Sequence, residues 1–254
     1  MMKRTLFLLI IPFFSFAQLT KTGFRHTNPN LYVDFSGRIG GGKGLERFGK
    51  QTLTFVCGNP LTIVHTTIKG VAPLNKTVTY GTVKSSLSGS EKCWITQNLG
   101  STNQATSETD ASEEAAGWYW KFNKKKGYKN DGTTSTPTFT PTFTNEISNW
   151  VAANDPCTIE LGTGWRIPTV TEWTNVNNTN LRAQAYAGPL KMHAAGIVTN
   201  NSGLINRGSQ FFYWSSSNSD ATLAKGLVIY TTQTYNQISN NDKDAGLSVR
   251  CIRD

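Results

Sequence analysis

The sequence predicts an α+β domain, because strand-like segments lie in the first and last parts of the chain and helix-like segments lie between them. The composition agrees: only 16% of the residues are charged, and Asn, Ser, Thr and Gly are abundant, which is typical of a loop-rich protein. The chain of 254 residues also contains four cysteines. An even number of cysteines in an exported chain indicates two disulfides, with three possible connectivities.

The first 17 residues have the pattern of a cleavable signal peptide. Lys3 and Arg4 precede an apolar run over residues 6–14, and Ser15-Phe16-Ala17 is a small-x-small cleavage site. Roughly 12 apolar residues are too few to cross a bilayer. We therefore expect residues 1–17 to be removed and the protein to be secreted or exposed at the cell surface, with no transmembrane segment.

Residues 18–48 are rich in Gly and in basic residues, and few apolar positions recur there. This composition predicts a flexible or partly ordered lead-in before a single domain over residues 49–254. Gly40-Gly41-Gly42-Lys43 lacks the spacing of a phosphate-binding P-loop, and no apolar strand runs into it.

The first half of the domain predicts short strands. Val, Ile, Thr and Phe recur with partial alternation over residues 52–57, 61–68 and 77–84, and further strands are expected over 93–96 and 118–122. Residues 100–116 are polar and rich in Ala and Glu, which predicts a loop with a short helix. Pro137 and Pro141 exclude regular structure from the Thr- and Pro-rich stretch over 129–146.

Two helices are predicted in the middle of the chain. Residues 145–153 place Ile147, Trp150 and Val151 at helical spacing. The second helix is expected to begin at Thr169, because Thr169-Val170-Thr171-Glu172 fits the capping-box pattern. From residue 197 onward the chain again predicts strands and polar loops, with the clearest strands over 227–230 and 247–252.

The charge and the histidines exclude several kinds of site. The formal net charge is +9, but the basic residues are dispersed and only Lys124-Lys125-Lys126 forms a run, so nucleic acid is not an expected partner and an acidic surface polymer is a weaker alternative. His26, His65 and His193 are scattered, and no two cysteines form a CxxC motif. We therefore expect no metal site and no cofactor.

Three late motifs carry a family resemblance. They are Gly164-Trp165-Arg166-Ile167-Pro168-Thr169 running to Glu172-Trp173, then Tyr213-Trp214-Ser215-Ser216-Ser217, then Ser248-Val249-Arg250-Cys251-Ile252-Arg253-Asp254. Earlier matches are Tyr80-Gly81-Thr82-Val83, the stretch from Lys92 to Gly100, Gly117-Trp118-Tyr119-Trp120 and Asn154-Asp155-Pro156-Cys157. As a set, over residues 52–254, they resemble the FISUMP-type major paralogous domains of secreted bacterial envelope proteins, which are similar to C-type lectins in fold.

The resemblance implies a C-type lectin-like domain with two helices, small antiparallel sheets, long loops and two disulfides. It implies that Cys157 pairs with Cys251, which leaves Cys57 with Cys93. It also implies that the last strand pairs beside the strand around residues 80–84. The sequence departs from calcium-binding lectins, since it contains no Glu-Pro-Asn, Gln-Pro-Asp or Trp-Asn-Asp triplet, so calcium-dependent sugar binding is not expected.

The stretch over residues 213–245 is the candidate binding surface, because it combines Tyr and Trp with many amides, a composition that favours recognition. The candidate ligand-binding residues are Trp214, Asn218, Asp220, Tyr230, Tyr235, Asn236, Asn240, Asn241 and Asp242. Two other groups of residues are expected to be structural. Arg166 and Glu172 would hold a capped helix, and the core would contain Trp94, Trp118, Trp120, Trp165 and Trp173.

Two function classes follow. The first is a non-catalytic, secreted or cell-surface recognition module that binds a glycan or a protein through the late loops. The second is an enzyme, because formylglycine-generating oxidases also resemble this fold; those enzymes need reactive cysteines, whereas here all four are expected in disulfides. His193 has no GxSxG-type nucleophile motif nearby, so no catalytic residue is assigned. A purely structural envelope component is a third possibility, and the oligomeric state is not predicted.

Overall fold

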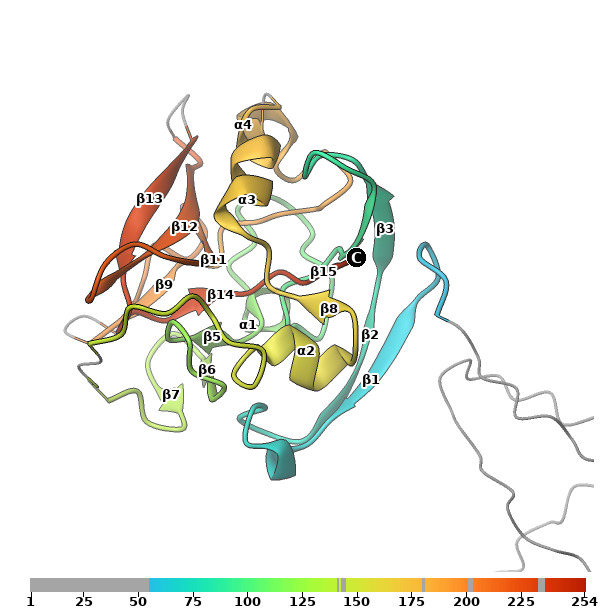
Figure 1. The fold of residues 1–254 in the computed structure, drawn as a ribbon. Coiled ribbons are helices and arrows are strands. Elements are labelled where there is room, and N and C mark those ends of the chain that lie inside the picture. The colour runs from blue at the N-terminus through green and yellow to red at the C-terminus, as the bar shows by residue number, and fades with distance from the viewer. Residues whose placement is uncertain (1–54, 141, 143–144, 180, 201–202, 233–235) are drawn as a thin grey trace, which may run out of the picture. The chain divides into compact units, whose positions relative to one another are not determined.

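The computed structural model describes residues 55–140, 142, 145–179, 181–200, 203–232 and 236–254, which fold into sheets with a few short helices (Figure 1). This confirms the predicted α+β class. The predicted signal peptide (1–17) and lead-in (18–48) lie outside the described residues. Within the part of the chain that is described, no helix is both long enough and apolar enough to span a bilayer.

The strand predicted over residues 61–68 is present but ends at His65, whereas residues 55–57 of the strand predicted over 52–57 are not in a strand. The strands are β1 (Leu61–His65), β2 (Lys76–Tyr80), β3 (Thr82–Ser85), β4 (Lys92–Ile95), β5 (Tyr119–Trp120), β6 (Gly127–Asn130), β7 (Ser135–Thr136), β8 (Trp165–Arg166), β9 (Ile197–Thr199), β10 (Gly203–Ile205), β11 (Gln210–Asn218), β12 (Leu223–Tyr230), β13 (Asn236–Asp242), β14 (Leu247–Ser248) and β15 (Ile252–Arg253). The helices are the 3-10 helix η1 (Thr67–Lys69), α1 (Glu113–Ala116), α2 (Pro156–Leu161), α3 (Val170–Asn177) and α4 (Leu181–Gln184).

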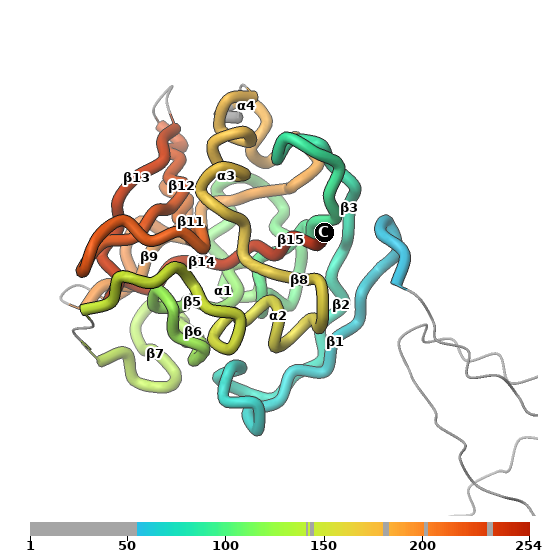
Figure 2. Tube along the Cα trace, in the orientation of Figure 1, coloured from blue at the N-terminus to red at the C-terminus, as the bar shows by residue number. Residues whose placement is uncertain are grey.

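Two larger sheets organise the domain. One has seven strands in the order β13-β12-β11-β14-β5-β6-β7, and the other has four in the order β3-β4-β15-β8. Figure 2 shows how the C-terminal strand β15 reaches the neighbourhood of β8 and β3, which are far from it in sequence. The expectation that the last strand pairs beside residues 80–84 is wrong by one strand, because β4 lies between β3 and β15.

The predicted strand over residues 77–84 divides at Gly81. Before this glycine, β2 pairs with β1; after it, β3 pairs with β4. The N–H of Gly81 donates to the side chain of Gln97, and a Cβ at this position would lie 2.5 Å from the Thr96 hydroxyl. Gly81 therefore lets one extended segment serve two sheets.

The predicted helix over residues 145–153 is absent, and α2 begins only at Pro156, with Asp155 as its N-cap. Ile147 is 81% exposed, so the helical spacing of its apolar neighbours did not mark a buried face. The backbone of this segment instead bonds across to strands: the N–H of Glu146 donates to Ala221 and that of Trp150 to Ser216. These tertiary bonds outweigh the weak local preference for a helix.

The core is rich in tryptophan. The five tryptophans that we expected inside are at most 3% exposed, which confirms that expectation. Trp94 and Trp173 lie 5.3 Å apart, ring to ring, and join β4 to α3 in one apolar cluster. Trp118 and Trp120 belong to a second cluster, which extends to the hairpin of β1 and β2.

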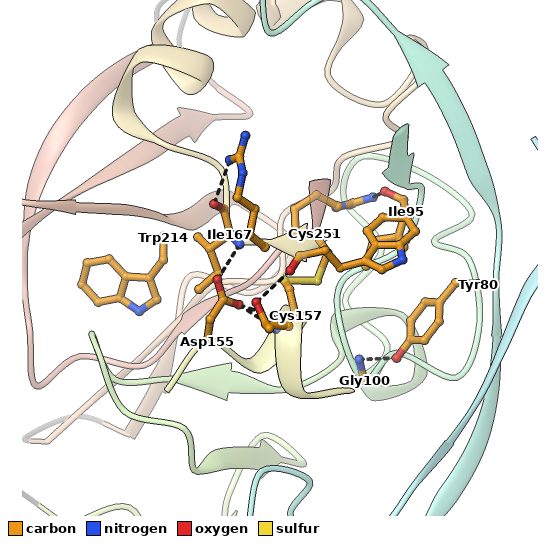
Figure 3. Close-up of a disulfide and its surroundings, with 12 residues drawn as sticks. Tyr80, Ile95, Gly100, Asp155, Cys157, Ile167, Trp214 and Cys251 are labelled. Atoms are coloured by element: carbon orange, nitrogen blue, oxygen red, sulfur yellow. Dashed lines mark hydrogen bonds between the residues drawn. A yellow bond between two sulfur atoms is a disulfide. The ribbon is translucent and has the colours of Figure 1, made fainter. Parts of the chain in front are cut away.

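Both disulfides implied by the family resemblance are present. Cys57 is bonded to Cys93 and Cys157 to Cys251, across 36 and 94 residues of sequence. Figure 3 shows the second bond, which ties α2 to the residue before β15, beside the Asp155 cap. Closing loops of these lengths contributes about 3–5 kcal/mol each in the chain-entropy model.

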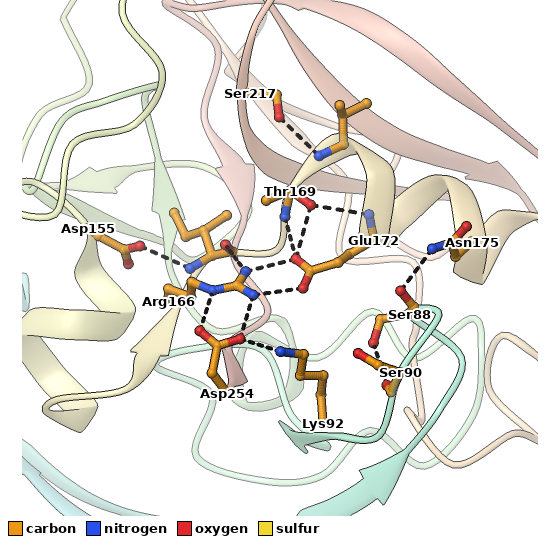
Figure 4. A network of polar contacts seen from close by, with 12 residues as sticks. Ser88, Ser90, Lys92, Asp155, Arg166, Thr169, Glu172, Asn175, Ser217 and Asp254 are labelled. Carbon is orange, nitrogen blue, oxygen red and sulfur yellow. Dashed lines mark hydrogen bonds and ion pairs between the residues drawn. The ribbon is translucent and has the colours of Figure 1, made fainter.

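The start of α3 is held by an ion-pair network (Figure 4). Thr169 and Glu172 form the predicted capping box. The Arg166 guanidinium donates to both carboxylate oxygens of Glu172, at 2.7 Å each, and also to Asp254. Burial alone would raise the pKa of Glu172, but the bonds from Arg166 and Thr169 lower it below its ordinary value. The motif around Arg166 is therefore structural, as expected.

Thr169→Ala is expected to lower the free energy of unfolding by roughly 0.5–2 kcal/mol, because the backbone N–H of Glu172 loses its acceptor. Chemical denaturation measures the loss. Thr171→Ala, at an exposed position in the same helical turn, is the matched control and should change stability little. Equal effects of the two substitutions would contradict a specific capping role.

Candidate functional site

Three segments meet at one end of the seven-stranded sheet, and we call this region the polar tip: residues 145–149, the turn 218–222 between β11 and β12, and residues 240–243. The backbone N–H of Asn218 donates to the Asn149 side chain at 2.8 Å, and the Asn218 amide donates to the Ile147 carbonyl at 3.1 Å. The Ser219 hydroxyl donates to Asn240 at 3.0 Å. The tip is thus fixed by bonds between segments distant in sequence.

A buried lysine lies under the tip. Lys243 is only 4% exposed, and its ammonium group donates to the carbonyls of Glu146, Asp220 and Ala221. These carbonyls belong to two of the three segments, and Lys243 itself belongs to the third. One charged group therefore holds all three together through charge-assisted hydrogen bonds, which are stronger than neutral ones.

A second buried lysine supports the adjoining segment. Lys121 is 2% exposed and donates to the Thr140 carbonyl and the Thr142 hydroxyl, and its ammonium lies 3.5 Å from the carboxylate of Asp244. Asp244 accepts in turn from the N–H of Thr142 at 3.1 Å. The Thr- and Pro-rich stretch was expected to lack regular structure, but it contains β7 and the end of β6, which pair before Pro137. Lys121 attaches the residues that follow to the domain.

The surface of the tip combines amide, carboxylate and apolar groups. Asp220, Asn240 and Asp242 are exposed, and so is Ile147. Asp220 accepts from the N–H groups of Thr222 and Leu223 at 2.8 Å each, and these bonds lower its pKa below the ordinary value. The Asp220 carboxylate is therefore ionised at neutral pH and fixed in direction. Such a surface can accept and donate hydrogen bonds, and it can also make an apolar contact through Ile147.

Four of the nine predicted ligand residues lie at this tip: Asn218, Asp220, Asn240 and Asp242. Tyr230 and Asn236 lie at the other end of the β12–β13 hairpin. The eight residues of β12 separate the two ends, and an extended strand of that length spans about 23 Å. Asn236 is occupied there by hydrogen bonds to Asn177 at the end of α3. The predicted residues therefore do not form one continuous surface.

Two further predicted ligand residues are buried, which corrects the prediction for them. Trp214 is fully buried, with its indole N–H donating to the Trp120 carbonyl at 2.6 Å and its ring packed against Phe122 and Trp150. Asn241 is 9% exposed and points back toward the sheet, donating to the Ser239 carbonyl. The ninth, Tyr235, lies outside the described residues.

The C-terminal signature also contains a buried cation. Arg250 is fully buried and donates to the carbonyls of Ile95 and Leu190 and to the Asn98 side chain. It has no carboxylate partner among the described residues, and burial lowers the pKa of its guanidinium. His193 lies close enough for this charge to act on it and is 1% exposed. These groups order the core and do not reach solvent.

The structure also contains a buried series of hydrogen-bonded side chains that the sequence did not predict. His65 Nδ1 lies 2.5 Å from Glu160 Oε2, and its Nε2 lies 2.8 Å from the Tyr80 hydroxyl, which accepts from the N–H of Gly100. The order carboxylate, imidazole, hydroxyl is that of a catalytic triad. All three side chains are buried, however, so substrate has no access and the series is structural. Only the alternation within β1 hinted that His65 faces inward.

Two further observations concern the cysteines and the side chains that commonly bind metal ions. All four cysteines are in disulfides. In the described part of the chain, no cluster of three or more His, Cys, Asp or Glu side chains is placed to hold a metal ion. The polar tip is the candidate functional site because it brings exposed polar groups from three distant segments together in a fixed arrangement.

Lys243→Met is expected to lower the free energy of unfolding by roughly 1–3 kcal/mol, because it keeps the apolar stem but leaves buried carbonyls without a donor. Denaturant titration gives this loss. Lys126→Met, at an exposed lysine, provides the control and should be near neutral. If both variants melt like the wild type, the three segments do not depend on the ammonium.

His193 predicts an acid sensitivity. Burial, followed by the charge of Arg250, lowers the pKa of His193 to about 3 from its usual 6.5. Below pH 6.5 the His193 imidazole is therefore protonated in the unfolded chain but stays neutral in the folded chain. The free energy of unfolding falls with decreasing pH as a result, by up to about 1.4 kcal/mol per pH unit. His193→Leu should flatten the stability profile between pH 7 and pH 5. An identical slope in the two proteins would refute this assignment.

Comparison with known proteins does not add an assignment to this geometry. No family model matches the chain, and neither a curated protein nor a solved structure matches it.

Proposed function

We propose that this protein is an exported, non-catalytic recognition module of the FISUMP type with a C-type lectin-like fold, and that it binds a glycan or a surface protein through the polar tip. Three features support the fold assignment. They are the two disulfides at the implied pairings, the C-terminal strand inserted between two others, and the structural positions of the signature residues Arg166, Trp214 and Arg250.

The observation that carries the proposal is the fixed geometry of the tip. Its three segments are joined by hydrogen bonds and by Lys243, so exposed groups from distant parts of the sequence are held in one arrangement before any ligand binds. Preorganisation of this kind reduces the entropy lost on binding. The tip exposes Ile147 as well as amides and carboxylates, and recognition surfaces usually combine apolar and polar groups in this way.

Export is supported by the same structure. Two disulfides stabilise a loop-rich domain, and disulfides persist in oxidising compartments outside the cytosol. Together with the signal-peptide pattern of residues 1–17, this favours a secreted or cell-surface location.

The proposal predicts separable effects on binding and folding. Ile147→Ser and Asp242→Ala should each weaken binding by about 1 kcal/mol or more, close to fivefold in Kd, while changing stability by less than about 0.5 kcal/mol. Both side chains are exposed, so their removal leaves the core unaltered. A glycan array and immobilised envelope proteins, each with and without a calcium chelator, first identify a ligand for titration.

Val64→Ser is the matched control, since Val64 is 63% exposed but lies on β1, outside the three segments of the tip. It should leave binding unchanged. Binding that survives both tip substitutions would place the ligand elsewhere on the domain. Absence of binding to both panels would favour the purely structural envelope component.

A further inference from the structure

The two disulfides have different surroundings. Cys157 and Cys251 are both fully buried, in the core between α2 and β15. Cys57 is only partly buried, and both Cys57 and Cys93 line an open pocket of about 230 Å³. A small thiol can therefore approach one disulfide and not the other.

The register of the four-stranded sheet places cations on both sides of Cys93. Lys84 of β3 and Arg253 of β15 are its direct partners on the two neighbouring strands. Residues directly opposite in an antiparallel pair share a face, with Cβ atoms about 5 Å apart. Both basic side chains therefore lie on the face that carries the disulfide, and both line the pocket. The opposite face carries Trp94, Ile252 and Val83, which pack in the core.

Lys84 and Arg253 differ in whether they form ion pairs with other residues. Lys84 pairs with Glu91 at 2.9 Å, but both side chains are more than half exposed, so the pair is weak. Arg253 has no acidic partner among the described residues. Its guanidinium lies 4.9 Å from the centre of the Phe55 ring, and Phe55 packs in turn on Trp165. Stacking fixes this guanidinium beside the pocket. Two carboxylates also line the pocket, but Glu91 pairs with Lys84, and Asp254 pairs with Lys92 and Arg166, so neither neutralises Arg253.

A glycine of the signature makes room for Arg253. Gly164 has φ +89°, and a Cβ there would lie 3.2 Å from Arg253 Nε and 3.5 Å from its Cγ. Any other residue at 164 would be strained and would crowd the arginine side chain. Gly164 thus supplies the space, and Trp165 supports Phe55, the ring that positions Arg253 beside Cys93.

We propose that the Cys57–Cys93 disulfide is a thiol-exchange site, independent of the polar tip. A thiolate enters the pocket and attacks Cys57 Sγ, the more exposed residue of the pair. The new S–S bond joins the incoming thiol to Cys57, and the electron pair of the broken bond leaves on Cys93 as a thiolate. Arg253 and Lys84 stabilise that anion, and a thiolate that is a better leaving group accelerates exchange.

The partner class is a thiol, either a small molecule or an accessible cysteine of another protein. A single exchange leaves a mixed disulfide on Cys57 and therefore a covalent attachment. A second thiolate, attacking the sulfur of the first partner, releases that partner as a disulfide and leaves Cys57 and Cys93 reduced. Two electrons then pass from the two thiols to the protein.

The test is differential alkylation of the native, oxidised protein exposed to reduced glutathione, with peptide mapping after acid quenching. Cys57 and Cys93 should be modified at least about tenfold faster than Cys157 and Cys251, with glutathione found on Cys57 and the alkylating reagent on Cys93. A small protein carrying one exposed cysteine, used in place of glutathione, shows whether protein thiols also enter. Simultaneous modification of all four cysteines, or glutathione on Cys93, would overturn the proposal.

Arg253→Gln separates the electrostatic argument from simple exposure. It should slow exchange several-fold, whereas Lys126→Gln, which removes a distant exposed charge, should leave the rate unchanged. In a Cys57→Ser background, the ionisation of the free Cys93 thiol can be followed by its thiolate absorbance. Its pKa should lie below the usual value of about 8.5 and rise when Arg253 is also replaced. If Arg253→Gln changes neither the rate nor this pKa, the cations have no role and the proposal fails.

Discussion

The short segment from Leu247 to Arg253 joins the two large sheets, and each of these sheets depends on it for an inner strand. Its first part, β14, pairs with β11 and β5 in the seven-stranded sheet; its last part, β15, pairs with β4 and β8 in the four-stranded sheet. Between them, the Val249 carbonyl accepts from the N–H of Leu99, and Cys251 forms the buried disulfide. Without this segment neither sheet is complete, since it is an inner strand of both.

Buried cations bonded to backbone carbonyls compensate for the shortage of regular structure. Arg250, Lys121 and Lys243 each donate to carbonyls of other segments, and all three are nearly inaccessible to solvent. Loop carbonyls inside a protein need donors, and a cation with several donors satisfies more than one at a time. Burial of the charge is costly, so such sites are stable only when the carbonyls are already converging. In this domain, therefore, the loops keep their conformation because the buried cations bind their carbonyls, and the cations are stable there because those carbonyls converge.

The sequence predicted what depends on local chemistry and failed where distant segments meet. The capping box at Thr169 and the inward position of the tryptophans follow from short patterns, and family resemblance supplied the disulfides. The helix over 145–153 failed because backbone bonds from Glu146 and Trp150 to the β11–β12 region decide that segment. The polar tip was found only in part, since Trp214 turns inward and nothing local indicated that Lys243 would collect carbonyls from two other segments.

The basic residues that give the net charge of +9 differ in how far their charges are compensated by neighbouring groups. The ammonium of Lys243 and the guanidinium of Arg250 bind carbonyls of the protein itself. They therefore hold the loops in place and do not attract a ligand. Arg166 is neutralised by Glu172 and Asp254. Arg253 differs: its guanidinium is held by an aromatic ring, faces a pocket and has no carboxylate partner in the described residues. A basic residue can act on an incoming group only if its charge is not already compensated. By that criterion Arg253 is suited to act on an incoming group. It lies directly opposite Cys93, one of the two cysteines of the accessible disulfide.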